Sequence, residues 1–293
     1  MTEDLAPGIH DMRVADAYGG LRDFLLFVPH GNVRGLAVIF HPFGSRPELV
    51  LEGGIDGGYL IRPLTGTVVC AQTLRLAVLA PRARGRQLDG VSLAWKDHLD
   101  AVWQLSESLR DDFRLTTVGA GGLSMGGLEA LVFAGQHPEG VGAVWATNPI
   151  VDLAQWYRDL SPGDPTAGEP GLSSLIATEV GGSPDEVPLE YRARSPFDYV
   201  DSLARVPVRI AWSSNDTVIP NQRTPHSHPL ASQLRARQAD VTEVIVTHAP
   251  TNESDDTGRF AHEACDVREA MGWLAEAIVP SEPIGTAQLK RIA

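Results

Sequence analysis

Short apolar runs alternate along this chain with longer stretches of helical spacing, and the runs at residues 35–40 and 76–80 are continuous. A continuous apolar run is typical of a strand that is buried on both faces. The runs that we interpret as strands span residues 21–29, 35–40, 76–80, 115–119, 141–146, 206–212 and 241–246. The stretches that we interpret as helices span residues 95–109, 126–136, 230–237 and 261–277. This alternation predicts βαβ units, and hence an α/β fold with a mainly parallel central sheet flanked by helices.

The segment 152–204 interrupts the alternation. It is rich in proline, glycine and charged residues, and it lies between two predicted strands. Long insertions of this kind commonly cover a functional site. A chain of 293 residues is long enough for two domains, although α/β folds of this length often form one. We therefore expect a single domain over residues 1–293, with a cap or lid insertion at about 152–204.

Composition and charge exclude several classes of partner and cofactor. The chain has 24 basic and 37 acidic residues and a formal charge of −13, which argues against nucleic acid and against an anionic membrane surface as a partner. Cys70 and Cys265 lack the CxxC spacing, and His226 and His228 lack a convincing third ligand, so we expect neither a metal nor another cofactor. The acidic beginning and the absence of an 18-residue apolar run predict a cytoplasmic protein.

One motif carries chemistry. Residues 122–126 read Gly-Leu-Ser-Met-Gly and match G-x-S-x-G, with a predicted strand before them and a predicted helix after them. A serine on a sharp strand-to-helix turn needs small neighbours, and the turn exposes its Oγ beside a helix N-terminus. We therefore take Ser124 as a candidate nucleophile. The alternative is a solvated serine on a glycine-rich turn.

With this motif the chain resembles the α/β-hydrolase superfamily, and in particular the dienelactone-hydrolase and prolyl-oligopeptidase-type serine hydrolases. Three further segments carry the resemblance: residues 41–44 (His-Pro-Phe-Gly) after a buried strand, residues 191–220 (YRARSP through NDTVIP), and the helix after His262. The resemblance spans about residues 21–278 and is weakest in the segment 152–204. It implies an α/β-hydrolase fold and a Ser-His-Asp triad.

The resemblance also assigns the other two members of the triad. The acid would be Asp216, which would hold the imidazole in one tautomer and stabilise its cation. Asp152, after another strand, is the alternative acid. The base would be His262 at the start of the last helix, with His248 as the alternative. The resulting order Ser124, Asp216, His262 is the order that this fold uses.

The resemblance also indicates an oxyanion hole made of two backbone N–H groups. Met125 follows the nucleophile and would supply one of them. Pro42 has no N–H, so Phe43 is the expected second donor. For the substrate pocket we select three further side chains: His41, Trp156 and Tyr157.

These residues predict a serine hydrolase that forms an acyl-enzyme on a small ester, thioester or amide. An acyltransferase or cyclase would use the same triad, and a non-hydrolytic binding protein or isomerase would use the fold without the serine. Relatives of the prolyl-oligopeptidase type usually carry a large N-terminal propeller, whereas only residues 1–20 precede the first predicted strand, so we expect peptidase activity less. The expected partner is a small-molecule substrate, and a homodimer is left open.

Overall fold

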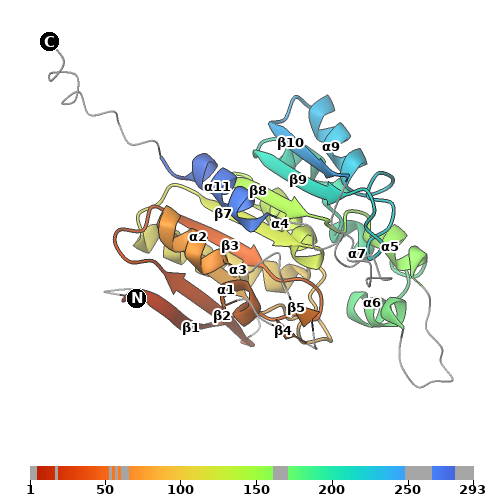
Figure 1. Ribbon diagram of the computed structural model, residues 1–293. Helices are drawn as coiled ribbons and strands as arrows, with labels where there is room; N and C mark the ends of the chain where they lie inside the picture. Colours follow the sequence, from red (N-terminus) through yellow and green to blue (C-terminus); the bar gives the residue numbers. More distant parts are fainter. Residues whose placement is uncertain are drawn as a thin grey trace, which may run out of the picture.

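The computed structural model describes residues 5–16, 19–52, 55–56, 59–60, 66–160, 171–247 and 266–280. Its centre is an eight-stranded sheet with the order β1-β2-β6-β3-β7-β8-β9-β10 (Figure 1). In that order the strands span Gly8–Ala15, Leu21–Val28, Leu76–Pro81, Gly35–Phe40, Val118–Leu123, Val141–Thr147, Val208–Ser213 and Val241–Val246. β2 pairs antiparallel with both β1 and β6, and the other neighbours pair parallel.

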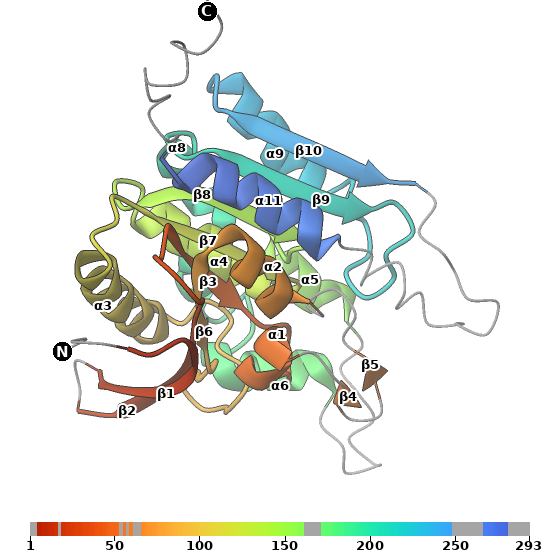
Figure 2. The same ribbon diagram turned by 60° about the vertical axis from the view of Figure 1, so that its left-hand side comes forward.

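Helices cover both faces of this sheet. On one face lie α1 (Pro47–Glu52), α2 (Thr67–Leu74) and α11 (Val267–Ile278), and Figure 2 shows α2 and α11 in front of the strands. On the other face lie α3 (Lys96–Asp112), α4 (Met125–Gln136) and α9 (Ser227–Ala236). Each face has its own apolar core. Because both faces are covered, every residue of β3, β6 and β7 is buried, which explains their continuous apolar runs.

The described residues of the segment, 152–160 and 171–204, form a series of short helices. They are α5 (Leu153–Asp159), α6 (Leu172–Val180), α7 (Pro188–Ala193), the 3-10 helix η1 (Pro196–Tyr199) and α8 (Val200–Leu203). α5, α6 and α7 lie at the end of the molecule toward which β8 and β9 point (Figure 1). In parallel sheets this end carries the functional loops.

The predicted α/β fold with a mainly parallel sheet is confirmed. The prediction that the first strand begins at Leu21 is wrong, because β1 precedes it. β1 is an edge strand with alternating half-buried and exposed residues, and its polar residues obscure the strand pattern. The short α1 and α2 and a two-stranded sheet of β4 (Ile55–Asp56) and β5 (Tyr59–Leu60) were also not predicted. Within the described ranges, none of the helices has the length and apolar character needed to cross a bilayer.

Candidate active site

Ser124 lies on the sharp turn between β7 and α4. Its backbone has φ 59° and ψ −120°, a conformation that non-glycine residues rarely adopt. Two hydrogen bonds maintain this turn: the Ser124 N–H donates to the Thr147 carbonyl at 2.9 Å, and the Ser124 carbonyl accepts from the Leu128 N–H at 3.1 Å. The residue is 5% exposed. The strand-turn-helix context that the motif requires is therefore present.

The glycines around Ser124 allow close packing with the end of β3. A Cβ atom on Gly126 would lie 2.2 Å from the Phe40 carbonyl oxygen, and one on Gly122 would lie 2.4 Å from the backbone of Gly126. Real Cβ atoms do not approach backbone this closely, so neither position accepts a side chain without a shift of the backbone. The loop that follows Phe40 is thereby held against the serine turn.

The two predicted oxyanion donors lie on neighbouring elements. Met125 is the first residue of α4, where a helix has no partner of its own for the N–H. Phe43 follows β3, which pairs with β7 through Phe40 and Gly122. Among the backbone hydrogen bonds of the described ranges, none uses the N–H of Phe43 or of Met125 as donor.

His41 shapes the loop that carries Phe43. Its Nε2 accepts from the Ala83 N–H at 3.0 Å, so the proton is on Nδ1, which donates to the Pro42 carbonyl at 2.8 Å. Burial lowers the pKa of His41 to about 4, and the ring is therefore neutral near pH 7. Both ring nitrogens engage the backbone, and they connect the loop after β3 to the loop after β6.

Asp216 lies in the loop after β9 and is 7% exposed. Its Oδ1 accepts from the N–H groups of Val218 at 2.9 Å and Ile219 at 3.1 Å. These two bonds orient the carboxylate on its own loop. β8 separates β7 from β9 in the sheet, so Ser124 and Asp216 follow strands that are two positions apart at the same sheet edge.

The alternative acid, Asp152, has a local structural role. It is the N-cap of α5, and its Oδ1 accepts from the Gln155 N–H at 2.8 Å. The two candidate bases, His262 and His248, lie outside the described residues.

The two aromatic residues predicted for the pocket differ in their surroundings. Trp156, on α5, is buried; its Nε1 donates to the Val218 carbonyl at 3.3 Å, and its ring meets Phe43 edge to face with centroids 6.5 Å apart. Tyr157 packs instead against Tyr191, with centroids 5.8 Å apart. Trp156 therefore contacts both the loop of Asp216 and Val218 after β9, called the acid loop below, and the loop of Phe43 after β3, called the oxyanion loop.

The His226 and His228 pair is part of the region that follows Asp216. The buried His226 accepts from the N–H groups of Val151 and Asp152 through Nδ1, at 3.3 and 3.2 Å. The Nδ1 of His228 is 3.0 Å from Glu243. Among the described residues, no group of three or more His, Cys, Asp or Glu side chains has a metal-binding arrangement.

Sequence reasoning missed a buried polar network beside α4. Glu179 on α6 is fully buried and accepts hydrogen bonds from the backbone N–H groups of residues 86, 87 and 88. Arg194 lies 3.6 Å from Glu179 and also donates to the Ser92 carbonyl at 3.2 Å. Ser92 in turn donates through its hydroxyl to Glu129 on α4. Nothing in the spacing of these residues indicates that they meet.

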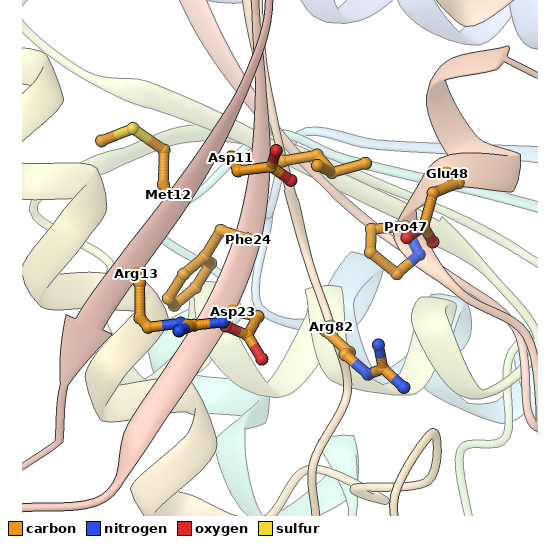
Figure 3. Close-up of a pocket in the computed structure, with 9 residues that line it drawn as sticks. Asp11, Met12, Arg13, Asp23, Phe24, Pro47, Glu48 and Arg82 are labelled. Atoms are coloured by element: carbon orange, nitrogen blue, oxygen red, sulfur yellow. The ribbon is translucent and has the colours of Figure 1, made fainter.

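A groove of about 490 Å³ lies elsewhere, between β1, β2 and the start of α1 (Figure 3). Its lining includes Asp11, Glu48 and Arg82, together with the ion pair of Arg13 and Asp23 at 2.6 Å. Neither Ser124 nor Asp216 lines this groove. It is therefore separate from the serine turn.

The sheet order and the strained serine between β7 and α4 define an α/β-hydrolase fold, as predicted. No protein-family profile matches the chain. Over 195 residues it is 27% identical to the uncharacterized peptidase YtmA of Bacillus subtilis, a match that covers 64% of this chain and 68% of YtmA.

Two solved structures illustrate the likeness in fold. Pyrococcus horikoshii acylaminoacyl peptidase has a TM-score of 0.64 at 16% identity, over 96% of this chain and 43% of that one. The chain thus spans less than half of that peptidase. The Staphylococcus aureus fluorophosphonate-binding serine hydrolase F has a TM-score of 0.59 at 14% identity, over 92% of this chain and 99% of the other.

Proposed function

We propose that this protein is a serine hydrolase that cleaves a small ester, thioester or amide through an acyl-enzyme on Ser124. The observation that carries the proposal is the geometry of Ser124, whose strained φ of 59° is maintained between β7 and the N-terminus of α4. Such strain persists only where the surrounding structure enforces it, and it is often found at functional sites. Similarity to proteins described as a serine hydrolase and as peptidases adds support.

In the proposed reaction, His262 takes the proton of the Ser124 hydroxyl while Oγ attacks the substrate carbonyl carbon. The negative charge that develops on the carbonyl oxygen is stabilised by the N–H groups of Phe43 and Met125. His262 then protonates the leaving group as its bond to carbon breaks. Water, deprotonated by His262, hydrolyses the acyl-serine ester and regenerates the enzyme. Asp216 orients and stabilises the imidazolium throughout.

We further propose that the segment 152–204 acts as a cap over this site. Trp156 supports this role, because α5 places it against Phe43 and against the carbonyl of Val218 in the acid loop. An apolar side chain in this place favours substrates with an apolar acyl group. Truncation of Trp156 should therefore raise KM most for esters with longer acyl chains.

A fluorophosphonate probe tests the nucleophile directly, because it reacts with an activated serine whatever the substrate is. The wild-type protein should be labelled covalently, and Ser124→Ala should abolish labelling and lower ester turnover by about a thousandfold or more. Ser92→Ala is the control variant, because it removes a serine hydroxyl outside the proposed triad and should leave labelling in place. A folded Ser124→Ala variant that is still labelled at the wild-type rate would exclude Ser124 as the nucleophile.

Peptidase activity is the second candidate, because YtmA and the Pyrococcus protein are both described as peptidases. A p-nitrophenyl acyl ester and a blocked amino-acyl p-nitroanilide with the same acyl part separate the two activities. A kcat/KM ratio that strongly favours the ester supports the esterase. A competing alcohol or amine in the same assay separates hydrolysis from acyl transfer, since a transferase gives the new ester or amide.

A further inference from the structure

The loop after β8 lies between the nucleophile and the acid. Thr147, the last residue of β8, accepts the Ser124 N–H at 2.9 Å. Pro149, in the loop, packs against Gly127 in the first turn of α4, where an added Cβ would come within 3.0 Å of the proline ring. The position of this loop therefore follows the position of the serine turn. Whatever connects Pro149 to the acid loop also sets the place of Asp216 relative to Ser124.

Gln222 makes that connection. It is 2% exposed, and its Nε2 lies 3.3 Å from the Pro149 carbonyl oxygen and 3.5 Å from Oδ2 of Asp216. At the other end of the amide, Oε1 accepts from the Ser227 hydroxyl at 2.6 Å. A flipped amide would direct its oxygen at a carbonyl and a carboxylate, which both only accept, so this orientation is the one that satisfies all three groups.

The carboxylate of Asp216 is therefore contacted from two sides. Its Oδ1 accepts from the backbone of its own loop, and its Oδ2 accepts from Gln222. Donors on both oxygens restrict the rotation of the carboxylate. A carboxylate oxygen has two acceptor directions, so an amide donor on Oδ2 is compatible with an imidazole donor on the same group.

We propose that Gln222 is a positioning residue of the reaction, which holds Asp216 at its working distance from Ser124 by donating to both Pro149 and Asp216. The inference rests on the proposed serine-hydrolase function. A role in packing alone predicts lower stability in Gln222 variants. A positioning role predicts, in addition, a loss of kcat and an altered ionisation of the catalytic base.

Two variants and a rescue separate these roles. Gln222→Met keeps the length of the side chain and removes both amide ends, and Gln222→Glu keeps the acceptor for Ser227 while it removes the donor. The double variant Gln222→Met/Ser227→Ala removes the hydroxyl that Gln222→Met leaves without its acceptor. Gln136→Met is the matched control, because Gln136 also donates from Nε2, to the Tyr199 hydroxyl at 3.2 Å, but at the far end of α4.

We expect Gln222→Met to lower kcat for a p-nitrophenyl ester by about ten- to a hundredfold with little change in KM, because small displacements of catalytic groups are costly. Without the amide donor, Asp216 is no longer held at its working distance and stabilises the imidazolium less, so the acid limb of the pH–kcat/KM profile should move to lower pH. Gln222→Glu, which is also designed to remove the amide donor, should lower kcat as well. The double variant should regain thermal stability without regaining kcat.

His226, which accepts hydrogen bonds from the loop after β8, does not contribute to the acid limb of the pH profile. Burial lowers its pKa to about 4, so it is neutral over the range from about pH 5 to pH 9 in which the limb is recorded. Among the described residues, Asp152, Asp159 and Asp216 act on its ring electrostatically.

The outcomes distinguish the inference from the function on which it rests. Wild-type protein that no fluorophosphonate labels would overturn the proposed function. Ser124-dependent labelling in wild type, with kcat and the acid limb unchanged in both folded Gln222 variants, would overturn the role of Gln222 alone. The role of Gln222 would also be overturned if the double variant regained kcat together with its stability. The same holds if Gln136→Met lowered kcat as much as Gln222→Met does.

Discussion

Gly126 shows how strictly single positions around the nucleophile are constrained. The atoms nearest to an added Cβ, at 2.2, 2.7 and 2.9 Å, all belong to the backbone of Phe40 and His41. Backbone atoms in a central strand cannot rotate away as a flexible side chain can. An added methyl group must therefore displace the loop that carries Phe43.

We expect Gly126→Ala to lower the free energy of unfolding by about 2 kcal/mol or more through overpacking. Labelling by a fluorophosphonate should also slow, because the oxyanion loop moves. Gly272 on α11 is the matched control: a Cβ added there would have nothing within 4 Å, so Gly272→Ala should raise stability by up to about 1 kcal/mol through helix propensity. Urea unfolding measures both changes, and equal effects of the two substitutions would contradict the packing argument.

Glu129 makes folding stability depend on pH. Burial on α4 raises its pKa from 4.5 to about 8, although the Ser92 hydroxyl and the Ala94 N–H, which favour the charged form, oppose the shift. Between these two pH values the folded state holds a proton that the unfolded state has released. Stability from this group is therefore fully present below about pH 4.5 and is lost as the pH rises toward about 8.

Glu129→Gln removes this titration and keeps an acceptor for Ser92. From about pH 6 to pH 8, wild type should lose stability relative to the variant by on the order of 2 kcal/mol. Urea unfolding of both proteins at the two pH values gives the difference directly. A difference that stays constant with pH would show that Glu129 is already ionised in the folded protein.

At the scale of elements, α6 is attached to the body through the side chain of Glu179. This fully buried carboxylate accepts three successive N–H groups of the loop 86–88 and lies 3.6 Å from Arg194. Removal of one member of a buried ion pair leaves the other charge uncompensated. The docking of α6 therefore combines this electrostatic contact with the complete burial of Ile176 and Val180.

Glu179→Gln should lower the free energy of unfolding by about 3 kcal/mol, because it leaves Arg194 unpaired and directs an amide nitrogen at backbone donors. The double variant Glu179→Gln/Arg194→Met should recover part of this loss, because it removes the charge that Glu179→Gln leaves unpaired. Glu186→Gln, at an exposed acid that bonds Ser183, should leave Tm unchanged. A double variant that is less stable than Glu179→Gln would indicate that Arg194 has an independent role.

The elements also show which parts of the fold the sequence predicts. β3 and β8 match their predicted spans within one residue, because a strand buried between two helix layers is apolar almost throughout. β10 also matches its predicted span, although it is a half-buried strand at the edge of the sheet. β1 lies at an edge, and α1 and α2 are short, so their patterns are weak. Glu179 and Gln222 were not predicted as functional or structural centres, because polar residues become buried only where distant loops meet.

At the scale of the whole molecule, the formal charge of −13 acts on every approaching substrate. A field of this sign raises the local concentration of cations near the surface and lowers that of anions, and salt screens it. The acidic excess therefore favours neutral or cationic substrates without selecting a particular one. Ser124 and Asp216 are themselves buried, so local contacts should dominate selectivity once the substrate is bound.

Three esters with the same acyl group and a neutral, a cationic or an anionic alcohol test this expectation. Between low salt and about 0.5 M salt, kcat/KM should fall by at least about twofold for the cationic ester, rise for the anionic ester and stay nearly constant for the neutral one. The effect should lie in KM more than in kcat, because the long-range field acts on encounter and binding. An identical salt dependence for all three esters would show that the net charge serves solubility and does not influence the choice of substrate.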